Sequence, residues 1–418
     1  MLTMTERDRA TLNGDYGAGA AIAMRIVCNT ANVMSAAELI DVSCAHIDGC
    51  VYHGIVSLDF VERLVTTGAK VCIPTTLNVG SLDLIHPELF HGGKAVKTAA
   101  KRLMEAHIEL GCESTFTCAP YQLRHRPAKG EQIAWAESNA IVFANSVLGA
   151  YTERYGDFLD LAAAITGRVP YAGLHVTANR AGQIVFNVPD FSSYSERDIY
   201  YATIGALVGR EVGVRIPVLV GLPADTTEDE LKALGSGAAA TGAVGLFHAV
   251  GITPEAPTLE AALQGQQPEK TVDVSFGDLR RVRDQMSGAV AGDPLIAVAL
   301  GTPHFSHAEF RKLSLLLAHY SRPMKSDFYV NTGRLILAEL KASGAAEVLQ
   351  KQGVTVVVDT CTYFTPVMRK LSGLVMTNSA KWANYAPVNI GVSVAFGSME
   401  ECVRSAYEGK VWFNDKPQ

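Results

Sequence analysis

The chain has 418 residues, of which 48% are hydrophobic and 19% are charged, so it can bury a large core and form two or three domains. Its net charge is −6 and it has no long basic or acidic run, which argues against a nucleic-acid partner and a membrane-surface role. No apolar run reaches the roughly 18 residues of a membrane span, and the first residues lack a signal-peptide pattern. We therefore expect the cytoplasm, where thiols stay reduced.

The first part of the chain predicts short strands, helices and polar loops. Strands are expected at Leu39–Val42, which leads into the loop His46–Cys50, and at Val71–Ile73, which leads into Pro74–Gly80. Helices are expected at residues 17–28, Leu58–Thr67, Gly93–Leu110 and Ala134–Leu148.

From about residue 195 the pattern becomes regular, with short apolar, β-branched strands that alternate with helices. This pattern predicts an α/β fold with parallel or mixed sheets flanked by helices. The expected strands are Ile216–Leu222, Val244–Val250, Leu295–Leu300, Asp327–Val330, Val354–Asp359, Gly373–Met376 and Gly391–Phe396. The expected helices include Thr227–Gly235, Ser306–Tyr320, Gly333–Ser343 and Ser398–Glu408.

One segment, Gln264–Thr271, has the Gly, Gln and Pro content of a linker. It predicts a division into an N-terminal α/β region of residues 1–270, which carries Cys50 and Cys118, and a C-terminal α/β domain of residues 271–418, which carries Cys361.

The eight cysteines are too few for a disulfide scaffold, and no CxxC pattern supports a zinc ribbon or a thioredoxin-like site. Three of them lie in loop-like segments with polar or turn-forming neighbours: Cys50, Cys118 and Cys361. If folding brings them together, three thiolates could hold an iron–sulfur cluster with one iron free to bind substrate. Cys28, Cys72 and Cys402 fit buried apolar positions, whereas Cys44 and Cys112 are ambiguous.

Other polar residues follow predicted strands, where open α/β sheets bind ligands. Asn378, Ser379 and Lys381 precede a predicted helix and could bind a carboxylate or a phosphate, although an ordinary helix cap explains them equally well. His46, His53 and His304 have loop positions suited to a site, whereas His175 and His248 fit satisfied core histidines. The remaining candidates are Thr75, Thr76 and Asn78 after one strand, and Glu137, Ser138 and Asn139 in a mostly apolar helix.

Several long segments resemble the aconitase X family. They include Ala45–Gly54, which contains His46-Ile47-Asp48-Gly49-Cys50, and Glu131–Gly149, which contains Ala136-Glu137-Ser138-Asn139-Ala140. The further matching segments are Ile73–Val79, Thr117–Tyr121, Gly242–Pro254, Met376–Lys381 and Phe396–Ser398. The matches extend over almost the whole chain.

The resemblance implies an iron–sulfur hydro-lyase that dehydrates a small 3-hydroxy acid, with cis-3-hydroxy-L-proline converted to Δ1-pyrroline-2-carboxylate as the first expectation. The positions that best match the family's cluster ligands are Cys50, Cys118 and Cys361, and both a two-iron and a four-iron cluster remain open. A separate small subunit with the swivelling domain is expected to complete the site, because this chain resembles the large, catalytic part.

The resemblance also suggests roles for the polar candidates. Lys381, Asn378 and Ser379 are expected to hold the substrate carboxylate, whereas His304, Glu137 and Asn78 are expected in the active site. The remaining substrate-binding candidates are Thr75, Thr76, Ser138 and Asn139. The general base stays unassigned and could lie on the second subunit.

Three other interpretations stay open at this point. The substrate could be mevalonate 5-phosphate, which archaeal relatives dehydrate. The chain could be a non-catalytic iron–sulfur or metal-binding regulatory protein. It could also be an α/β protein whose cysteines are only buried. A mononuclear His/carboxylate metal site also stays open, although the sequence has no HxH or HExxH motif. No GxSxG or P-loop motif supports a serine hydrolase or a P-loop enzyme.

Overall fold

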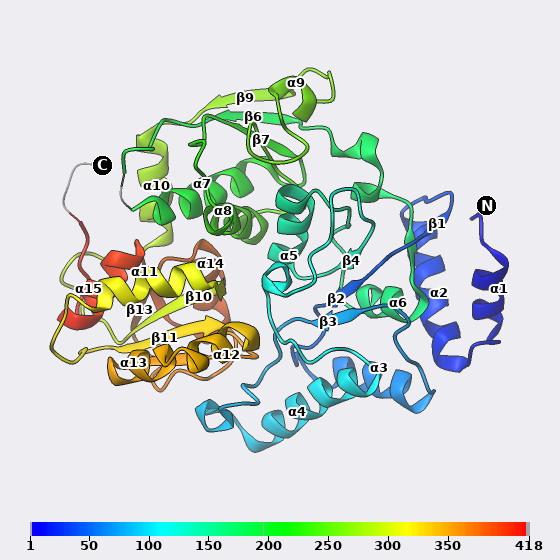
Figure 1. Cartoon of the computed structure of the whole chain (residues 1–418), viewed down its shortest axis with the longest axis horizontal. Helices are drawn as coiled ribbons and strands as arrows, with labels where there is room; N and C mark the ends of the chain where they lie inside the picture. The colour runs from blue at the N-terminus through cyan, green and yellow to red at the C-terminus, as the bar shows by residue number, and fades with distance from the viewer. Residues whose placement is uncertain (1, 195, 415–418) are drawn as a thin grey trace.

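The structure is a computed structural model that describes residues 2–194 and 196–414. It is a mixed α/β fold in which helices flank parallel sheets, as predicted, and the chain forms three regions around separate sheets. Figure 1 shows the first region in blue and cyan, the second in green, and the third in yellow to red. Within the described residues, every helix is too short or too polar to cross a bilayer.

The first region contains a three-stranded parallel sheet in the order β3-β2-β4 and a two-stranded antiparallel ribbon of β1 and β5. Its core forms where apolar helix faces pack together, with the helix pairs α2–α6 and α3–α4 in contact. The helices are α1 (Glu6–Asn13), α2 (Ala18–Val33), α3 (Ile55–Thr66), α4 (Lys94–Glu109), α5 (Ser138–Phe143) and α6 (Leu159–Thr166). The strands are β1 (Leu39–Asp41), β2 (Ala45–Ile47), β3 (Thr75–Leu77), β4 (Ala134–Trp135) and β5 (Arg168–Pro170).

The second region has a four-stranded parallel sheet in the order β8-β7-β6-β9. Its helices α7 and α8 approach closely because glycines line their contact; a Cβ at Gly237 would lie 2.9 Å from the carbonyl oxygen of Ala202. The strands are β6 (Ile184–Asn187), β7 (Pro217–Val220), β8 (His248–Ala249) and β9 (Lys270–Asp273). The helices are α7 (Arg197–Val212), α8 (Glu228–Thr241), α9 (Leu259–Ala262) and α10 (Phe276–Met286).

The third region is a five-stranded parallel sheet in the order β12-β11-β10-β13-β14. The strand order reverses between β10 and β13, so a crevice is expected where these two strands end. The strands are β10 (Ala297–Phe305), β11 (Asp327–Thr332), β12 (Val354–Val357), β13 (Leu374–Thr377) and β14 (Ser393–Phe396). The helices are α11 (His307–Leu317), α12 (Arg334–Ala342), α13 (Ala345–Lys351), α14 (Ala380–Ile390) and α15 (Met399–Glu408).

Two predicted elements of the first region are wrong. Val71–Ile73 is not a strand, because the backbone N–H groups of Val71 and Cys72 donate to the carbonyl oxygens of Leu110 and Ala164, and pairing begins only at Thr75. Residues 134–148 do not form one helix. They begin as β4, which pairs with β2, and continue as α5 and a π-helical turn, Ala144–Leu148.

The predicted division near residue 270 stays a prediction. β9 begins at that position and pairs with β6, so it belongs to the second sheet.

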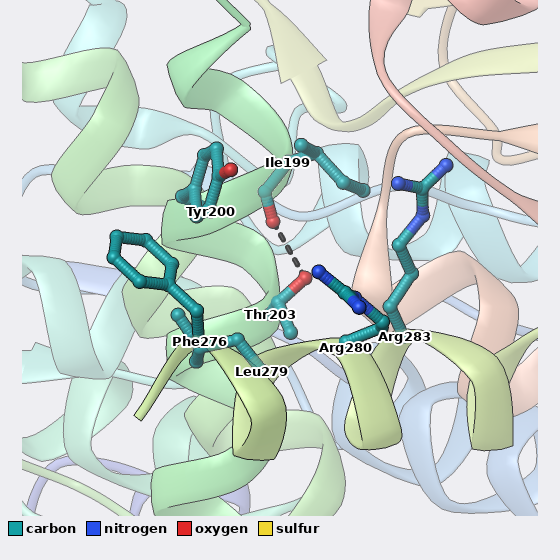
Figure 2. Close-up of a pocket in the computed structure, with 7 residues that line it drawn as sticks. All are labelled: Ile199, Tyr200, Thr203, Phe276, Leu279, Arg280 and Arg283. Atoms are coloured by element: carbon teal, nitrogen blue, oxygen red, sulfur yellow. Dashed lines mark hydrogen bonds between the residues drawn. The ribbon is translucent and has the colours of Figure 1, made fainter. Parts of the chain in front are cut away.

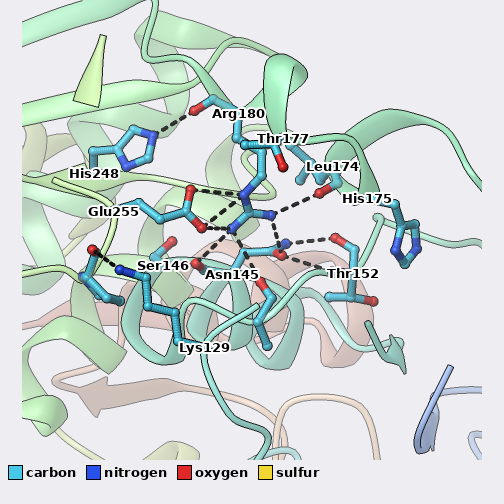
Figure 3. Close-up of polar contacts among 12 residues, drawn as sticks. Lys129, Asn145, Ser146, Thr152, Leu174, His175, Thr177, Arg180, His248 and Glu255 are labelled. Carbon is cyan, nitrogen blue, oxygen red and sulfur yellow. Dashed lines mark hydrogen bonds and ion pairs between the residues drawn. The ribbon is translucent and has the colours of Figure 1, made fainter. Parts of the chain in front are cut away.

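A buried arginine ties the first region to the second (Figure 3). The side chain of Arg180 is fully buried and binds Glu255, with 2.6 Å between Nη2 and Oε1. Its other N–H groups donate to Asn145 and to the backbone carbonyls of Leu174 and Ala150. The charge is therefore neutralised and most donors are satisfied, which makes this a structural contact.

A small pocket with two arginines lies between α7 and α10 (Figure 2). Its volume is ≈ 50 Å³, and Arg280 and Arg283 lie on one side of it. Arg283 forms an ion pair with the buried carboxylate of Glu401, with an N–O distance of 2.9 Å. None of the predicted site residues lines this pocket.

Candidate active site

Two thiols and an imidazole converge in the interior. The Sγ atoms of Cys118 and Cys361 and a ring nitrogen of His304 lie within 4.8 Å of one another, and all three residues are buried. The backbone N–H of His304 donates to Cys118 Sγ at 3.3 Å, and His304 Nε2 lies 4.0 Å from Cys361 Sγ. The structure therefore brings two of the three predicted cysteines together with the predicted histidine.

The position of this group follows from the sheets. His304 lies at the carboxyl end of β10, at the strand-order reversal of the third region. The loops that follow β2, β3 and β4 of the first region carry Asp48, Asn78 and Glu137 at the carboxyl edge of that sheet. The site forms where these two edges meet, which is the usual location of ligands in parallel sheets.

His304 is held through both its ring and its backbone. Its Nδ1 lies 3.0 Å from Thr117 Oγ1, and its backbone carbonyl accepts hydrogen bonds from Gln122 at 3.1 Å and Lys232 at 3.3 Å. Burial lowers the pKa of His304 to about 3, so the ring is neutral at physiological pH. A neutral imidazole keeps a lone pair that can bind a metal.

The loop that carries Cys361 is fixed by an ion pair. Asp359 has a φ of 61°, and its carboxylate accepts hydrogen bonds from Arg334 at 2.6 and 2.7 Å. Its backbone carbonyl also accepts a hydrogen bond from the N–H of Gly80 at 2.7 Å, and this contact ties the loop to the first region.

Cys50 does not lie with Cys118 and Cys361 in this structure. Its Sγ is directed to the carbonyl oxygen of Ile47, at 3.9 Å, and burial raises its pKa well above the ordinary value. The neighbouring residue, Val51, packs against the cluster of Val79, Cys118 and Cys361 instead. The loop therefore borders the site, but it presents an apolar side chain to it. The ligand role of Cys50 stays a prediction.

Lys381 and Glu137 form a buried ion pair beside the thiols. Lys381 Nζ donates to Glu137 Oε1, and it also lies 3.2 Å from Ser138 Oγ. Burial would raise the pKa of Glu137, but the Lys381 ammonium holds it below its usual value. Burial would lower the pKa of Lys381, but Glu137 raises it well above the usual value. Both groups are therefore charged at neutral pH.

The backbone of Glu137 is in an unusual conformation. Its φ is 73° and its ψ is 124°, a region that favours glycine, at the position where β4 ends and α5 begins. The carboxylate caps α5 by accepting a hydrogen bond from the N–H of Ala140 at 2.8 Å. The strained residue therefore directs its side chain both to the helix N-terminus and to Lys381.

Two further buried carboxyls lie at the Cys50 loop: Asp48 is in the loop, and Asp160 is on α6 next to it. Asp48 accepts a hydrogen bond from the side chain of Asn78, and its backbone N–H donates to Asp160 Oδ2 at 2.7 Å. Burial, and then the charge of Glu137, raises the pKa of Asp48 to about 8. Burial raises the pKa of Asp160 to about 7. Asp48 is thus protonated at neutral pH close to an ionised Glu137.

Four of the remaining candidates lie at or near this centre. Asn139 donates to the carbonyl oxygen of Cys118 at 3.2 Å and to Tyr121 at 2.8 Å. Thr76 is not one of the four, because its Oγ1 lies 2.8 Å from His46 Nδ1 and it lines a separate cavity with Cys44 and His125. Ser379 binds the carbonyl oxygen of Thr302 and caps α14. The other two are Asn78 and Ser138, whose contacts are given above.

Asn378 and Thr75 do not face the centre. The Asn378 amide is directed to Asp198, at 3.4 Å, and it lines a separate charged pocket. Thr75 donates to the carbonyl oxygen of Ile73 at 2.8 Å, which is a local contact.

Some residues of the site were not predicted as such. Asp48 lies inside the segment that ends at Cys50, and its buried position among carboxyls could only be found once α6 was placed beside it. The loop position of Asp48 was the available signal. Lys232 lies on α8 among apolar and small residues, and its contact with His304 has no local signal in the sequence.

The donor set fits an iron–sulfur group. Thiolates favour Fe–S clusters, and imidazole is also a ligand of iron. Three buried side-chain oxygens around the centre have no partner among the described residues: Asn78 Oδ1, Asn139 Oδ1 and Asn331 Oδ1. Asn331 also donates to Thr362, next to Cys361, at 3.2 Å. Buried amide oxygens are seldom left without a partner, so these atoms indicate room for a polar ligand.

Comparison with known proteins gives a consistent result. Three family models match: aconitase X first domain over residues 1–178, second domain over 182–284 and third domain over 295–408. The crystal structure of aconitase X from Thermococcus kodakaraensis in the holo-form is similar with a TM-score of 0.87 and 30% identity, over 97% of this chain and 100% of that chain.

Curated relatives include cis-3-hydroxy-L-proline dehydratases. That of Hypocrea jecorina is 40% identical over 98% of this chain and 69% of the relative, and that of Pseudomonas aeruginosa is 40% identical over 96% and 70%. The phosphomevalonate dehydratase large subunit of Methanocaldococcus jannaschii is 32% identical over 96% of this chain and 99% of the relative. On these matches and on the shared fold, the chain belongs to the aconitase X family.

Proposed function

We propose that this protein is a hydro-lyase that converts cis-3-hydroxy-L-proline to Δ1-pyrroline-2-carboxylate. The observation that carries the proposal is the convergence of Cys118, Cys361 and His304 next to the Lys381–Glu137 pair. The 40% identity to two cis-3-hydroxy-L-proline dehydratases supports the choice of substrate. We further assign the chain to the cytoplasm.

We assign an iron–sulfur cluster to the site, held by Cys118 and Cys361 with Cys50 as the third thiolate. Val51 packs against the cluster of Val79, Cys118 and Cys361, so the Cys50 loop borders the other two cysteines. His304 is the rival third ligand because its ring nitrogen lies nearer. When bound, an iron of such a cluster supplies a Lewis acid for the hydroxyl of the substrate.

Lys381 is the residue that we assign to the substrate carboxylate. An ammonium group has three N–H donors, and contacts with Glu137 and Ser138 use two of them. The third remains for a substrate carboxylate in a site where burial strengthens charge interactions. Ser138, Asn139, Asn78 and Ser379 are the further substrate-binding candidates near the centre.

Glu137 and Asp48 are suited to the two proton transfers. In cis-3-hydroxy-L-proline the hydroxyl and the carboxylate share a ring face, so loss of the α-hydrogen and the hydroxyl is an anti elimination. Glu137 is ionised and takes the α-proton as the C2=C3 double bond forms and the C3–O bond breaks. Asp48 is protonated and gives its proton to the departing hydroxyl, which leaves as water. The enamine then tautomerises to the cyclic imine.

The charge around the centre disfavours a phosphorylated substrate such as mevalonate 5-phosphate. Lys381 is paired with Glu137, and Lys232 is paired with Asp229 and Glu309. The ionised carboxylate of Glu137 would oppose a phosphate dianion. The two arginines in Figure 2 line a pocket that has no residue in common with this centre.

A second, small chain is proposed to complete the site. Relatives named as large subunits match this chain over 98–99% of their own length in M. jannaschii, T. kodakarensis and Methanosarcina mazei. The swivelling domain would then be provided by a partner, and the partner would close the site over the bound substrate.

The test is anaerobic purification with and without a co-expressed small subunit, followed by iron and sulfide analysis and assays on both substrates. We expect iron in the chain and turnover of cis-3-hydroxy-L-proline in the complex. Turnover of mevalonate 5-phosphate alone would overturn the substrate. Iron without turnover of either substrate would favour a non-catalytic iron–sulfur protein, and a protein without iron would favour cysteines that are only buried.

The third ligand is decided by two variants. Loss of iron in Cys50→Ala, with iron kept in His304→Ala, is the expected result. The reverse result would assign the position to His304.

A further inference from the structure

A second group of metal-binding side chains lies outside the catalytic centre. Cys44 Sγ, a carboxylate oxygen of Glu131 and a ring nitrogen of His125 lie within 4.8 Å of one another. Cys44 immediately precedes β2, and Glu131 lies shortly before β4. His125 is exposed and lies on the loop that precedes β4 in the sequence. None of the three has a role in the proposed dehydration.

The backbone fixes two of these residues relative to each other. The N–H of Ser43 donates to the carbonyl oxygen of Gln132 at 3.0 Å, and the N–H of Ala134 donates to the carbonyl oxygen of Cys44 at 2.9 Å. The segments that carry Cys44 and Glu131 are therefore joined like neighbouring strands.

Other groups orient the donor atoms. The Glu131 carboxylate accepts hydrogen bonds from the Ser43 hydroxyl and from the N–H of Ala128, the latter at 2.7 Å. Burial raises the pKa of the Cys44 thiol to about 11, and the side chain of Trp135 opposes this shift by a hydrogen bond to the sulfur. Hydrogen bonds of this kind to ligand atoms are typical of metal sites, where they fix the direction of each ligand.

A cavity adjoins the group. Its volume is ≈ 310 Å³, and Cys44, His125, Thr76 and Trp135 are among the residues that line it. Cys44 is buried, with 3% of its surface exposed, yet it reaches this cavity, so a small ion can approach the sulfur from solvent.

We propose that Cys44, His125 and Glu131 bind Zn²⁺, with the fourth coordination position open to this cavity. Sulfur, imidazole and carboxylate ligands together suit zinc, which takes them at about 2.0–2.3 Å in a tetrahedron. Tetrahedral ligands at such distances are roughly 3.5 Å apart. The three donor atoms, which now lie within 4.8 Å of one another, must therefore move slightly closer together. The exposed His125 side chain can make that movement without disturbing the core.

Zinc at this position would connect to the catalytic region through β2. Thr76, which lines the cavity, contacts His46 of β2 at 2.8 Å, and the ring centres of His46 and Trp135 are 5.9 Å apart. Bound zinc would join the loop of His125 to the start of the strand that leads to Cys50. The ion would therefore stiffen this strand from outside the site.

The experiment measures zinc bound to the cluster-loaded complex after equilibrium dialysis against Zn²⁺, by elemental analysis. The wild-type protein should hold one more zinc per chain than Cys44→Ser, Glu131→Gln or His125→Ala. His319→Ala, which removes another exposed histidine, is the matched control and should bind as the wild type does. Zinc should also raise the melting temperature of the wild type and of His319→Ala, but not that of His125→Ala.

His125 is exposed, so its replacement by alanine leaves the fold intact and keeps the test decisive if Cys44→Ser fails to fold. Equal zinc contents of the wild type and His125→Ala would overturn the site. So would zinc that is lost in Cys118→Ser and kept in Cys44→Ser, because the ion would then belong to the catalytic cysteines.

Discussion

The two cysteine-containing groups differ in how the fold surrounds them. Cys118, His304 and Cys361 come from two different regions, and each is buried with its neighbours fixed by hydrogen bonds. Cys44, His125 and Glu131 come from one sheet edge, and one of the three is exposed. The first group needs the whole chain to assemble, whereas the second needs only β2, β4 and one loop.

This difference separates their chemical uses. A group at the meeting of two sheet edges can place charged side chains on several sides of a substrate, as Lys381, Glu137 and Asp48 do here. Burial then shifts their pKa values apart, which provides an acid and a base at the same pH. The group of Cys44, His125 and Glu131 has few charged neighbours of this kind. Its surroundings therefore support the binding of an ion, but not acid–base catalysis.

The largest expected effect is the difference between replacing one cysteine of the buried group and replacing the cysteine of the exposed group. Cys361→Ser should lose iron and dehydratase activity completely, because a thiolate ligand is removed from a site with no exposed substitute. Cys44→Ser should keep both. Iron analysis and the turnover of cis-3-hydroxy-L-proline measure this. Cys72→Ser is the control, because Cys72 is exposed and the prediction of a buried position for it was wrong. If Cys44→Ser loses iron while Cys361→Ser retains it, the assignments are exchanged.

The next effect concerns the acid–base pair of the buried centre. Glu137→Gln should lower kcat by about 10²- to 10⁴-fold, the usual contribution of a positioned base, while iron content stays unchanged. Glutamine preserves the size of the side chain and the acceptor that caps α5. Steady-state kinetics and iron analysis of the same preparation measure this. An unchanged kcat would remove Glu137 from the mechanism.

A third effect appears in stability as a function of pH. The pKa of Asp160 is raised to about 7 in the folded protein, so the folded state keeps a proton that the unfolded state has lost above about pH 4. The wild type should therefore lose stability as pH rises from 4 to 7, on the order of 4 kcal/mol, relative to Asp160→Asn. Urea unfolding of the two proteins at several pH values measures this difference. Parallel pH profiles would contradict the raised pKa.

The smallest effect is expected at the exposed edge. Glu131→Gln, without added zinc, should cost only about 1 kcal/mol, because the amide keeps one acceptor oxygen for Ser43 or Ala128. Thermal unfolding in the presence of a chelator measures it. A loss as large as that of a buried ion pair would show that this edge is part of the core, and the contrast between the two groups would fail.

The parts of the structure that sequence predicted well have local causes. The strands of the third region are continuous apolar runs, and helices such as α11 and α15 begin with capping boxes at Ser306 and Ser398. Cys118 and Cys361 could be separated from other cysteines by their loop positions. These features depend on a few neighbouring residues.

The features that sequence did not predict depend on distant contacts. The strand expected at Val71–Ile73 is replaced by hydrogen bonds to Leu110 and Ala164, far along the chain. Lys381 and Glu137 are 244 positions apart. Each could be predicted as a site residue from its own segment, but their ion pair could not. Asn378 is next to Ser379 but its side chain faces Asp198, because neighbouring positions before a helix point in different directions.

The backbone of Glu137 has a consequence for anyone who modifies this protein. A non-glycine residue at a φ of 73° costs of order 1–3 kcal/mol. Glycine at this position would relieve that cost and also discard the carboxylate that binds Lys381. Removing one partner of a buried ion pair leaves the other charge unpaired and costs about 3–5 kcal/mol, which exceeds the strain that glycine would relieve. Selection for heat resistance alone should therefore keep glutamate at position 137, so stability and turnover select for the same side chain.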